Sequence, residues 1–301
     1  MPKVAFLFPG QGSQSVGMVR GLAPYPKALP LFRRASQGLE CDLFDLGLNG
    51  PEEILSQDLY AQIAVHVTNC AYAEEIRRIH LTPQLAAGFS LGIFSALVAA
   101  GSLSFEQGLE GVRIAAEKMS AEGRFHRGAM AALIGLTEGE VKKICREVTQ
   151  VFVASVNSSH QVVVSGEEGA VEKAIHLGME RWALLAKRLP IGWAIHTPLM
   201  ERASQAFARE IEDWPIYPPQ FPVLGYLRAE YLRTPEDIRQ ELSAQFSQPN
   251  CWHKALLRMA EEGINAFVEV GPGNVLSQMV RLVNRSALTF SAEEILQRGF
   301  P

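Results

Sequence analysis

The sequence predicts an α/β protein into which a smaller α+β part is inserted. Two apolar runs, residues 4–8 and 266–270, each end in a glycine-containing loop, as buried strands of an α/β sheet do. Between them, residues near 128–190 change to a compact alternation of short strands and helices. The chain has 301 residues, 48% of them hydrophobic and 20% charged, which is enough material for a large core.

The first strand runs into the loop Pro9-Gly-Gln-Gly-Ser-Gln-Ser-Val-Gly17. This loop lacks the Gly-Lys-Ser/Thr ending of a phosphate-binding loop, and its glycine spacing is not that of a dinucleotide fingerprint. Nucleotide binding is therefore not expected. Helical periodicity follows over residues 54–78, and residues 83–87 are expected to form the next strand.

Ser90 follows this strand directly, within the pentapeptide Gly88-Phe-Ser-Leu-Gly92. Residues 91–100 are strongly helical and Gly101 is the expected C-cap. A tight strand-to-helix corner exposes the serine hydroxyl, and the helix N-terminus directs free N–H groups to the place where an oxyanion would form. The alternative is a serine that only caps the helix.

The inserted part is expected to contain three strands and two helices. The strands are predicted at residues 129–134, 151–155 and 161–165, and the helices at residues 138–147 and 170–179. We find no internal repeats or low-complexity segments.

Composition excludes several classes of function. A net charge of −4 and a pI near 6.0 give no general attraction to nucleic acid or to an anionic membrane. The N-terminal apolar run is too short for a signal peptide, and no stretch of about 18 apolar residues exists to span a bilayer. We therefore expect a cytoplasmic protein.

The cysteines do not form a recognisable site. They are far apart and make no C-x-x-C pattern or Cys/His cluster, so neither a disulfide framework nor a metal site is expected. They are Cys41, Cys70, Cys145 and Cys251.

A serine nucleophile needs a base, normally a histidine. His196 is the best of the seven candidates. It follows a mostly apolar segment, residues 190–195, and precedes Thr197 and Pro198, so its side chain should be held rigidly at the start of a loop. For the other histidines we expect ordinary surface or core roles; these are His66, His80, His126, His160, His176 and His253.

Five motifs together resemble the malonyl-CoA:acyl carrier protein transacylase family, which includes polyketide acyltransferase domains and trans-acting acyltransferase or acyl hydrolase relatives. They occur in the family's order over nearly the whole chain. The motifs are FPGQGSQ at 8–14, GFSLG at 88–92, VNSSHQVVVSG at 156–166, IHTPLM at 195–200 and VEVGPGNVL at 268–276.

This resemblance implies a fold and a mechanism. Residues 1–126 and 197–301 would form an α/β-hydrolase-like domain with a parallel sheet, and residues 127–196 a ferredoxin-like subdomain. Ser90 would become acylated by a thioester, while His196 takes its proton and later returns it to a thiol. A true α/β-hydrolase has its histidine near the C-terminus, whereas more than 100 residues follow His196 here.

The remaining site residues follow from the same resemblance. The backbone N–H groups of Gln11 and Leu91 would form the oxyanion hole, and a backbone carbonyl of Gln245 would orient the histidine. Residues that would line the substrate site are Gln62, Phe89, Ala115, Asn157 and Ile195.

One departure from the family concerns the acyl group. Family members that use malonyl units carry an arginine that pairs with the free carboxylate, and Ala115 stands at that position. Arg113 lies two residues earlier, about 200° around the helix, and should face elsewhere. Malonyl should therefore be a poor substrate unless Arg124, Arg127 or another cation reaches the site by a different route. Phe89, Ile93 and Ile195 replace more polar or aromatic family residues and make the surroundings more apolar or reshape them.

The resulting hypothesis is a ping-pong acyltransferase of fatty acid or polyketide synthesis. It would move an acyl group from CoA or a carrier protein, through acyl-Ser90, to the phosphopantetheine thiol of an acyl carrier protein. We expect a monomer without bound cofactor or metal, and an acidic carrier protein as partner. Two alternatives remain: an acyl hydrolase that uses the same serine and histidine with water, and an inactive scaffold.

Overall fold

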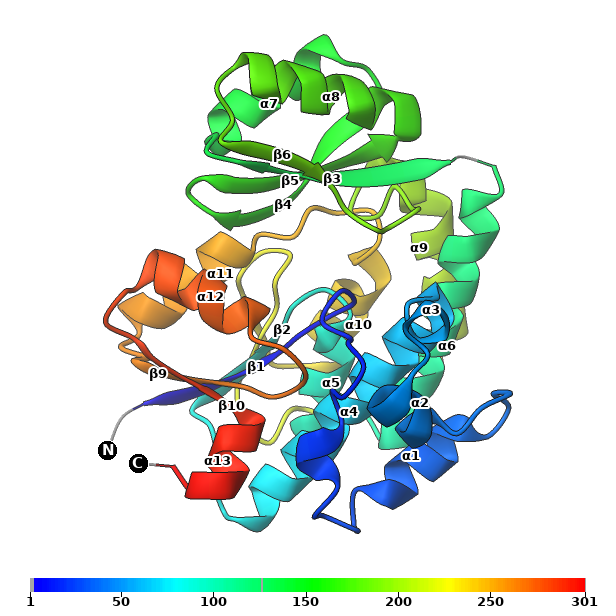
Figure 1. Ribbon diagram of the computed structural model, residues 1–301, viewed down its shortest axis with the longest axis vertical. Coiled ribbons are helices and arrows are strands. Elements are labelled where there is room, and N and C mark those ends of the chain that lie inside the picture. Colours follow the sequence, from blue (N-terminus) through cyan, green and yellow to red (C-terminus); the bar gives the residue numbers. More distant parts are fainter. Residues whose placement is uncertain (1–2, 126, 301) are drawn as a thin grey trace.

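The computed structural model describes residues 3–125 and 127–300, and it has two sheets. The expected boundary at residue 126, with His126, and the chain ends at residues 1 and 301 lie outside the described residues. The larger part surrounds a six-stranded sheet, and the smaller part, built on a four-stranded sheet, sits at one end of the molecule (Figure 1). The predicted fold class is confirmed.

The large sheet has the strand order β10-β9-β1-β2-β7-β8. All neighbouring strands run parallel except β7 and β8, which pair antiparallel. The three central strands β9, β1 and β2 are completely buried, as apolar strands covered by helices on both faces must be. The strands are β1 (Val4–Phe8), β2 (Leu85–Gly88), β7 (Val223–Leu224), β8 (Tyr231–Leu232), β9 (Ala266–Glu269) and β10 (Leu288–Ser291).

Helices cover both faces of this sheet. Helices α4, α5 and α6 lie together on one side, and α11 and α12 lie on the other (Figure 1). The helices of the large part are α1 (Leu29–Ser36), α2 (Leu43–Asn49), α3 (Glu52–Leu55), α4 (Asp58–Arg78), α5 (Gly92–Ala99), α6 (Phe105–Gly123), α9 (Glu201–Glu210), α10 (Pro235–Ala244), α11 (Trp252–Glu261), α12 (Val275–Val283) and α13 (Ala292–Arg298), with 3-10 turns at Arg20–Leu22 and Pro198–Met200.

One expected helix is divided in two. The periodicity over residues 54–78 belongs to the end of α3 and the whole of α4, because Gln57 has an extended backbone (φ −68°, ψ 136°) and starts a new helix. The single helix expected there is therefore wrong. In contrast, β1 begins and ends at the predicted residues, and Gly101 has the positive φ (73°) expected of a residue that ends α5.

The small part is a ferredoxin-like subdomain. Its chain order is β3, α7, β4, β5, α8, β6, and its antiparallel sheet has the order β4-β5-β3-β6. Both helices pack on the outer face of this sheet, and the other face is turned to the large part (Figure 1). The elements are β3 (Gly128–Ile134), α7 (Glu138–Glu147), β4 (Val151–Ser158), β5 (Gln161–Glu167), α8 (Glu168–Glu180) and β6 (Leu185–Arg188).

Backbone hydrogen bonds join the two parts at β4. The Asn250 N–H donates to the Ala154 carbonyl (2.8 Å), and the Asn250 carbonyl accepts from the Val156 N–H (2.9 Å). This connection holds the segment before α11 against the small sheet. Within residues 3–125 and 127–300, no helix combines the length and the apolar composition that crossing a bilayer requires.

Candidate active site

Ser90 lies at the sharp corner between β2 and α5. Its φ is +52°, which is uncommon for a residue with a side chain and turns the chain abruptly. The two glycines around it are required by space: a Cβ on Gly88 would lie 2.2 Å from the Gly92 carbonyl carbon, and one on Gly92 would lie 2.0 Å from the Phe8 carbonyl oxygen. The corner is therefore pressed against the end of β1, and the predicted strand-to-helix geometry is confirmed.

His196 is brought to Ser90 from a position 106 residues away in the chain. Ser90 Oγ and His196 Nε2 are 2.9 Å apart, a normal hydrogen-bond distance. On the other side of the ring, His196 Nδ1 lies 3.2 Å from the Gln248 carbonyl oxygen. Since a carbonyl can only accept, Nδ1 carries the proton and Nε2 is free to accept the proton of Ser90.

The carbonyl that accepts from His196 is not the expected one. The structure assigns this hydrogen bond to Gln248, and the expectation of Gln245 is corrected. Gln245 is the C-cap of α10, and the Ser247 and Gln248 N–H groups then turn back to the Ala244 carbonyl, which places the Gln248 carbonyl beside the ring. The Gln245 carbonyl is close enough to act on the pKa of the imidazole as a weaker acceptor.

The backbone holds His196 in place. Its φ is +64°, its N–H donates to the Phe246 carbonyl (2.7 Å), and the ring of Tyr226 meets the imidazole edge-on at 6.0 Å between centroids. Burial lowers the pKa of His196 to about 4, although the carbonyl hydrogen bonds act in the opposite direction. The imidazole is therefore neutral at pH 7, as a general base must be.

The loop after β1 approaches the corner closely. A Cβ on Gly10 would lie 2.5 Å from the Phe89 carbonyl oxygen and 3.5 Å from the Leu91 nitrogen. Gln11, the next residue, therefore lies close to the turn that carries Ser90. The Gln11 side chain is fixed by donating to Asp58 Oδ1 (2.7 Å) and accepting from Gln62 Nε2 (3.2 Å).

The other expected lining residues fall into different surroundings. Phe89 packs edge-on against Trp252 of α11 (5.3 Å between centroids). Asn157 is buried on β4, where its Oδ1 accepts from the Ser155 hydroxyl. Ile195 packs between the cores of the two parts, directly before the histidine. None of these three makes a hydrogen bond to Ser90 or His196 among the described residues.

Ala115 is buried in α6, with 1% of its surface exposed. Arg113 donates to the carbonyls of Ala35 (3.0 Å) and Gln37 (2.8 Å) at the C-terminal end of α1, so its guanidinium is engaged there. Arg124 and Arg127 are exposed at the surface.

Three residues near the pair were not singled out from the sequence: Gln248, Tyr226 and Glu241. Tyr226 follows β7 and touches the imidazole, and Glu241 of α10 accepts from the Tyr226 N–H. A backbone carbonyl has no sequence signature. The other two could be found only by knowing that β7 lies beside β2.

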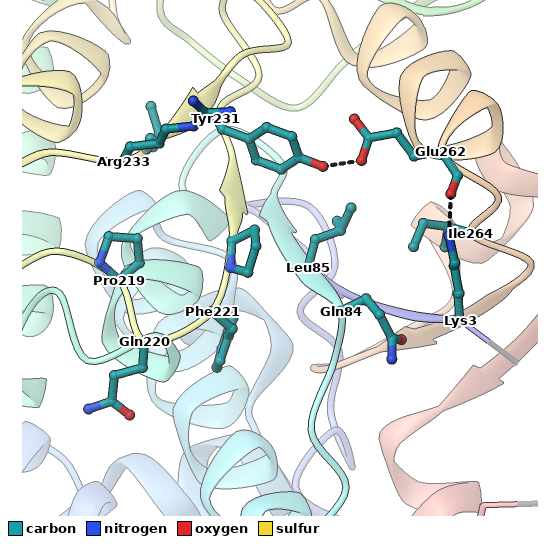
Figure 2. A pocket seen from close by; sticks show the side chains of 12 residues that line it. Lys3, Gln84, Leu85, Pro219, Gln220, Phe221, Tyr231, Arg233, Glu262 and Ile264 are labelled. Carbon is teal, nitrogen blue, oxygen red and sulfur yellow. Dashed lines mark hydrogen bonds between the residues drawn. The ribbon is translucent and has the colours of Figure 1, made fainter. Parts of the chain in front are cut away.

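A cavity of about 500 Å³ lies at the opposite end of the sheet. Lys3 precedes β1 and Leu85 begins β2, so the cavity opens at the amino ends of the strands (Figure 2). In it the Tyr231 hydroxyl donates to Glu262, and Lys3 Nζ donates to the Glu262 carbonyl (3.0 Å). Ser90 follows the carboxyl end of β2, and this cavity is therefore not part of the serine site.

The described residues contain no cluster of three or more His, Cys, Asp or Glu side chains that could hold a metal ion. All four cysteines are free thiols.

Comparisons with known proteins agree with this geometry. The acyl transferase domain family model matches residues 5–298. The malonyl CoA-acyl carrier protein transacylase of Bacillus subtilis is 36% identical over 299 residues, which cover 98% of this chain and 94% of that protein. The polyketide biosynthesis malonyl CoA-acyl carrier protein transacylase PksC of the same organism is 33% identical, over 94% of this chain and 98% of the relative.

Solved structures give the same result. The malonyl CoA-acyl carrier protein transacylase (fabD) of Coxiella burnetii superposes with a TM-score of 0.94 at 34% identity and covers 99% of this chain and 96% of its own. A type II PKS acyl-carrier protein in complex with its malonyl-transacylase matches with a TM-score of 0.93 at 32% identity, over 98% of each chain. The chain therefore belongs to the acyl transferase domain family, among the malonyl-CoA:acyl carrier protein transacylases.

Proposed function

We propose that this protein transfers an acyl group from a thioester to the phosphopantetheine thiol of an acyl carrier protein, through an ester on Ser90. The observation that carries the proposal is the 2.9 Å contact between Ser90 Oγ and the unprotonated Nε2 of His196. That contact supplies a nucleophile and its base, and the Gln248 carbonyl keeps the imidazole in the tautomer that can accept a proton.

In the first half-reaction Oγ attacks the thioester carbonyl carbon while Nε2 takes the hydroxyl proton. The tetrahedral intermediate then loses the thiolate, which receives that proton from the imidazolium. In the second half-reaction the carrier thiol gives its proton to Nε2 and attacks the ester, and Oγ leaves with the same proton. Each half-reaction ends with neutral His196, so no further acid or base is needed.

The N–H groups of Gln11 and Leu91 are the donors we assign to the oxyanion. Gln11 is held by its side-chain hydrogen bonds, and Leu91 is the N-cap residue of α5. The backbone N–H groups of both residues have no acceptor among the described residues and are free to donate. Such a donor typically contributes about 3–4 kcal/mol to the transition state.

The partner follows from the relatives. Several proteins similar to this chain are named for transfer to an acyl carrier protein, and one similar structure contains such a carrier bound to its transacylase. We infer the same class of acceptor here. We also expect a cytoplasmic monomer, and light scattering after size exclusion tests the monomeric state.

We infer that the acyl group has no free carboxylate. Ala115 presents no cation, and Arg113 is engaged with two backbone carbonyls outside α6. A buried carboxylate that loses its partner costs about 3–5 kcal/mol, which corresponds to roughly a hundredfold to a few thousandfold in affinity. Acetyl or longer apolar acyl groups avoid this penalty.

The experiment incubates the protein with malonyl-CoA, acetyl-CoA and longer acyl-CoAs and measures intact mass. We expect a mass increase with apolar donors, its absence in Ser90→Ala, and movement of the acyl group to added carrier protein. Release as free acid without carrier acylation would identify an acyl hydrolase instead. An unchanged mass with every donor would refute the acyl-enzyme.

The substrate assignment is tested by Ala115→Arg, which should increase loading by malonyl-CoA. The neighbouring buried residue gives a matched control, since Ala116→Arg adds the same charge about 100° around the helix. Malonyl loading by the unmodified protein as fast as by any other donor would contradict the assignment.

A further inference from the structure

Tyr226 lies beside the reacting atoms although no motif points to it. It is the second residue after β7, and β7 pairs in parallel with β2, with Leu224 opposite Ala87. Both chains therefore leave the sheet at the same edge, where Ser90 follows β2. The Tyr226 side chain is completely buried, and its ring stands edge-on (88°) to the imidazole of His196.

The phenol hydroxyl is buried without a hydrogen-bond partner among the described residues. A buried hydroxyl left in this way costs free energy that a phenylalanine at the same position would avoid. Burial raises the pKa of Tyr226 far above its usual value, and the Ser90 hydroxyl is the side chain that acts on it in the opposite direction. The phenol therefore remains a neutral O–H donor, and Ser90 Oγ, which is hydrogen-bonded to the imidazole that the tyrosine ring contacts, offers it an acceptor.

Tyr226 is also held firmly by its backbone. The N–H groups of Tyr226 and Leu227 both donate to Glu241 Oε1 (2.7 and 3.1 Å), and the Tyr226 carbonyl accepts from the Cys251 N–H (2.9 Å). Gly225 makes room for this carboxyl group, since a Cβ there would lie 2.8 Å from Glu241 Oε2. The placement of the phenol is thus fixed by α10 and by the segment before α11.

We propose that the Tyr226 hydroxyl donates a hydrogen bond to Ser90 Oγ, and that this bond strengthens as Oγ leaves the acyl group. The inference rests on the proposed function and adds a catalytic residue to it. When the carrier thiol has attacked, the C–Oγ bond breaks, its electron pair goes to Oγ, and His196 returns its proton to Oγ. The phenol keeps its own proton and stabilises the negative charge that develops on Oγ.

The two half-reactions should not depend equally on this bond. In the acyl-enzyme Oγ is an ester oxygen, a weak acceptor, so the hydrogen bond is gained mainly in the transition state of release. In the free enzyme Oγ is a hydroxyl, which is a stronger acceptor than an ester oxygen, so less of the bond remains to be gained in the transition state of loading. Because a hydrogen bond to a charged group is strong, its loss should slow release by about ten- to a hundredfold and slow loading less.

The test is Tyr226→Phe, which keeps the ring against His196 and removes only the hydroxyl. Tyr72→Phe is the matched control, because Tyr72 is also a buried tyrosine but lies on α4 near Glu293, away from the serine. Rapid-quench intact mass should show acyl-Ser90 accumulating in Tyr226→Phe during transfer to carrier protein, with normal transfer in the control. The melting temperature of Tyr226→Phe should stay equal or rise, since an unpartnered buried hydroxyl is removed.

Each other outcome opposes the inference. Equal release rates in Tyr226→Phe and wild type would show that the hydroxyl has no role, and a lower melting temperature with both half-reactions slowed equally would show a structural role. Labelling of the wild type by a fluorophosphonate probe separates the two proposals. If Ser90 is not labelled, the proposed function fails; if Ser90 is labelled and acylated while Tyr226→Phe releases normally, only the present inference fails.

Discussion

The pH dependence of Ser90 reactivity should reveal how deeply His196 is buried. Burial lowers its pKa to about 4, whereas an ordinary histidine has a pKa near 6.5. Only the neutral ring can accept the serine proton. Acidification should therefore leave the enzyme active well below pH 6.5 and inactivate it only near pH 4.

The size of the effect follows from the two pKa values. At pH 5 a histidine of pKa about 4 is about 90% neutral, and one of pKa 6.5 is about 3% neutral. The rate at pH 5 should then be about 30 times higher than an ordinary histidine would allow. The sign of the His196 contribution to stability is also fixed. Unfolded His196 takes up a proton below pH 6.5 and the folded residue does not, so this contribution is lost as pH falls from 6.5 toward 4.

The assay is the rate of fluorophosphonate labelling between pH 4 and 8, because this probe does not depend on the acyl donor or the carrier protein. Circular dichroism at each pH confirms that the protein is folded. His253→Gln serves as control, since His253 is only half-buried at the start of α11 and should leave the profile unchanged. A midpoint at pH 6–7 in the wild type would refute the reasoning from burial.

Two further predictions concern the frame of the site. Gly92→Ala should destabilise the protein by about 3–5 kcal/mol in urea unfolding, because the new Cβ would clash with the Phe8 carbonyl of the neighbouring strand. Gly139→Ala on α7 is the control, since a Cβ there contacts nothing within 4 Å. It should stabilise the protein by about 0.5–1 kcal/mol. Equal effects would contradict this account of the corner. Burial raises the pKa of Glu241 to about 7, so the folded state binds this proton more tightly, and the contribution of Glu241 to stability should fall by about 3 kcal/mol as pH rises from 4.5 to 7. Urea titrations should show that Glu241→Gln removes this part of the pH dependence, and an unchanged slope would argue against it.

The strand-to-helix corner could be predicted from sequence because it is local. Gly88 and Gly92 lie on either side of Ser90 within five residues. The apolar segments before and after them predict a strand and a helix. His196 was also found, since Pro198 and the apolar approach mark it as a rigidly held residue.

The features that the sequence does not reveal depend on the order of the strands in the sheet or on the path of the backbone. Tyr226 lies against His196 only because β7 pairs with β2, and no local pattern encodes that pairing. Gln248 acts through its carbonyl, which every residue possesses, so its position depends on how the turn after α10 closes. The break before α4 was missed because no proline or glycine marks Gln57, whose extended backbone starts the new helix.

The carbonyl behind His196 has a consequence for the direction of the reaction. A carboxylate beside the ring would stabilise the imidazolium and let the protonated form accumulate. The uncharged Gln248 carbonyl stabilises a buried cation much less. The imidazolium should therefore lose its proton quickly to the leaving atom, which is the thiol sulfur in one half-reaction and Ser90 Oγ in the other. In the proposed transfer such an arrangement favours neither the C–S nor the C–O bond, so we expect the acyl group to move between the two thiols in either direction.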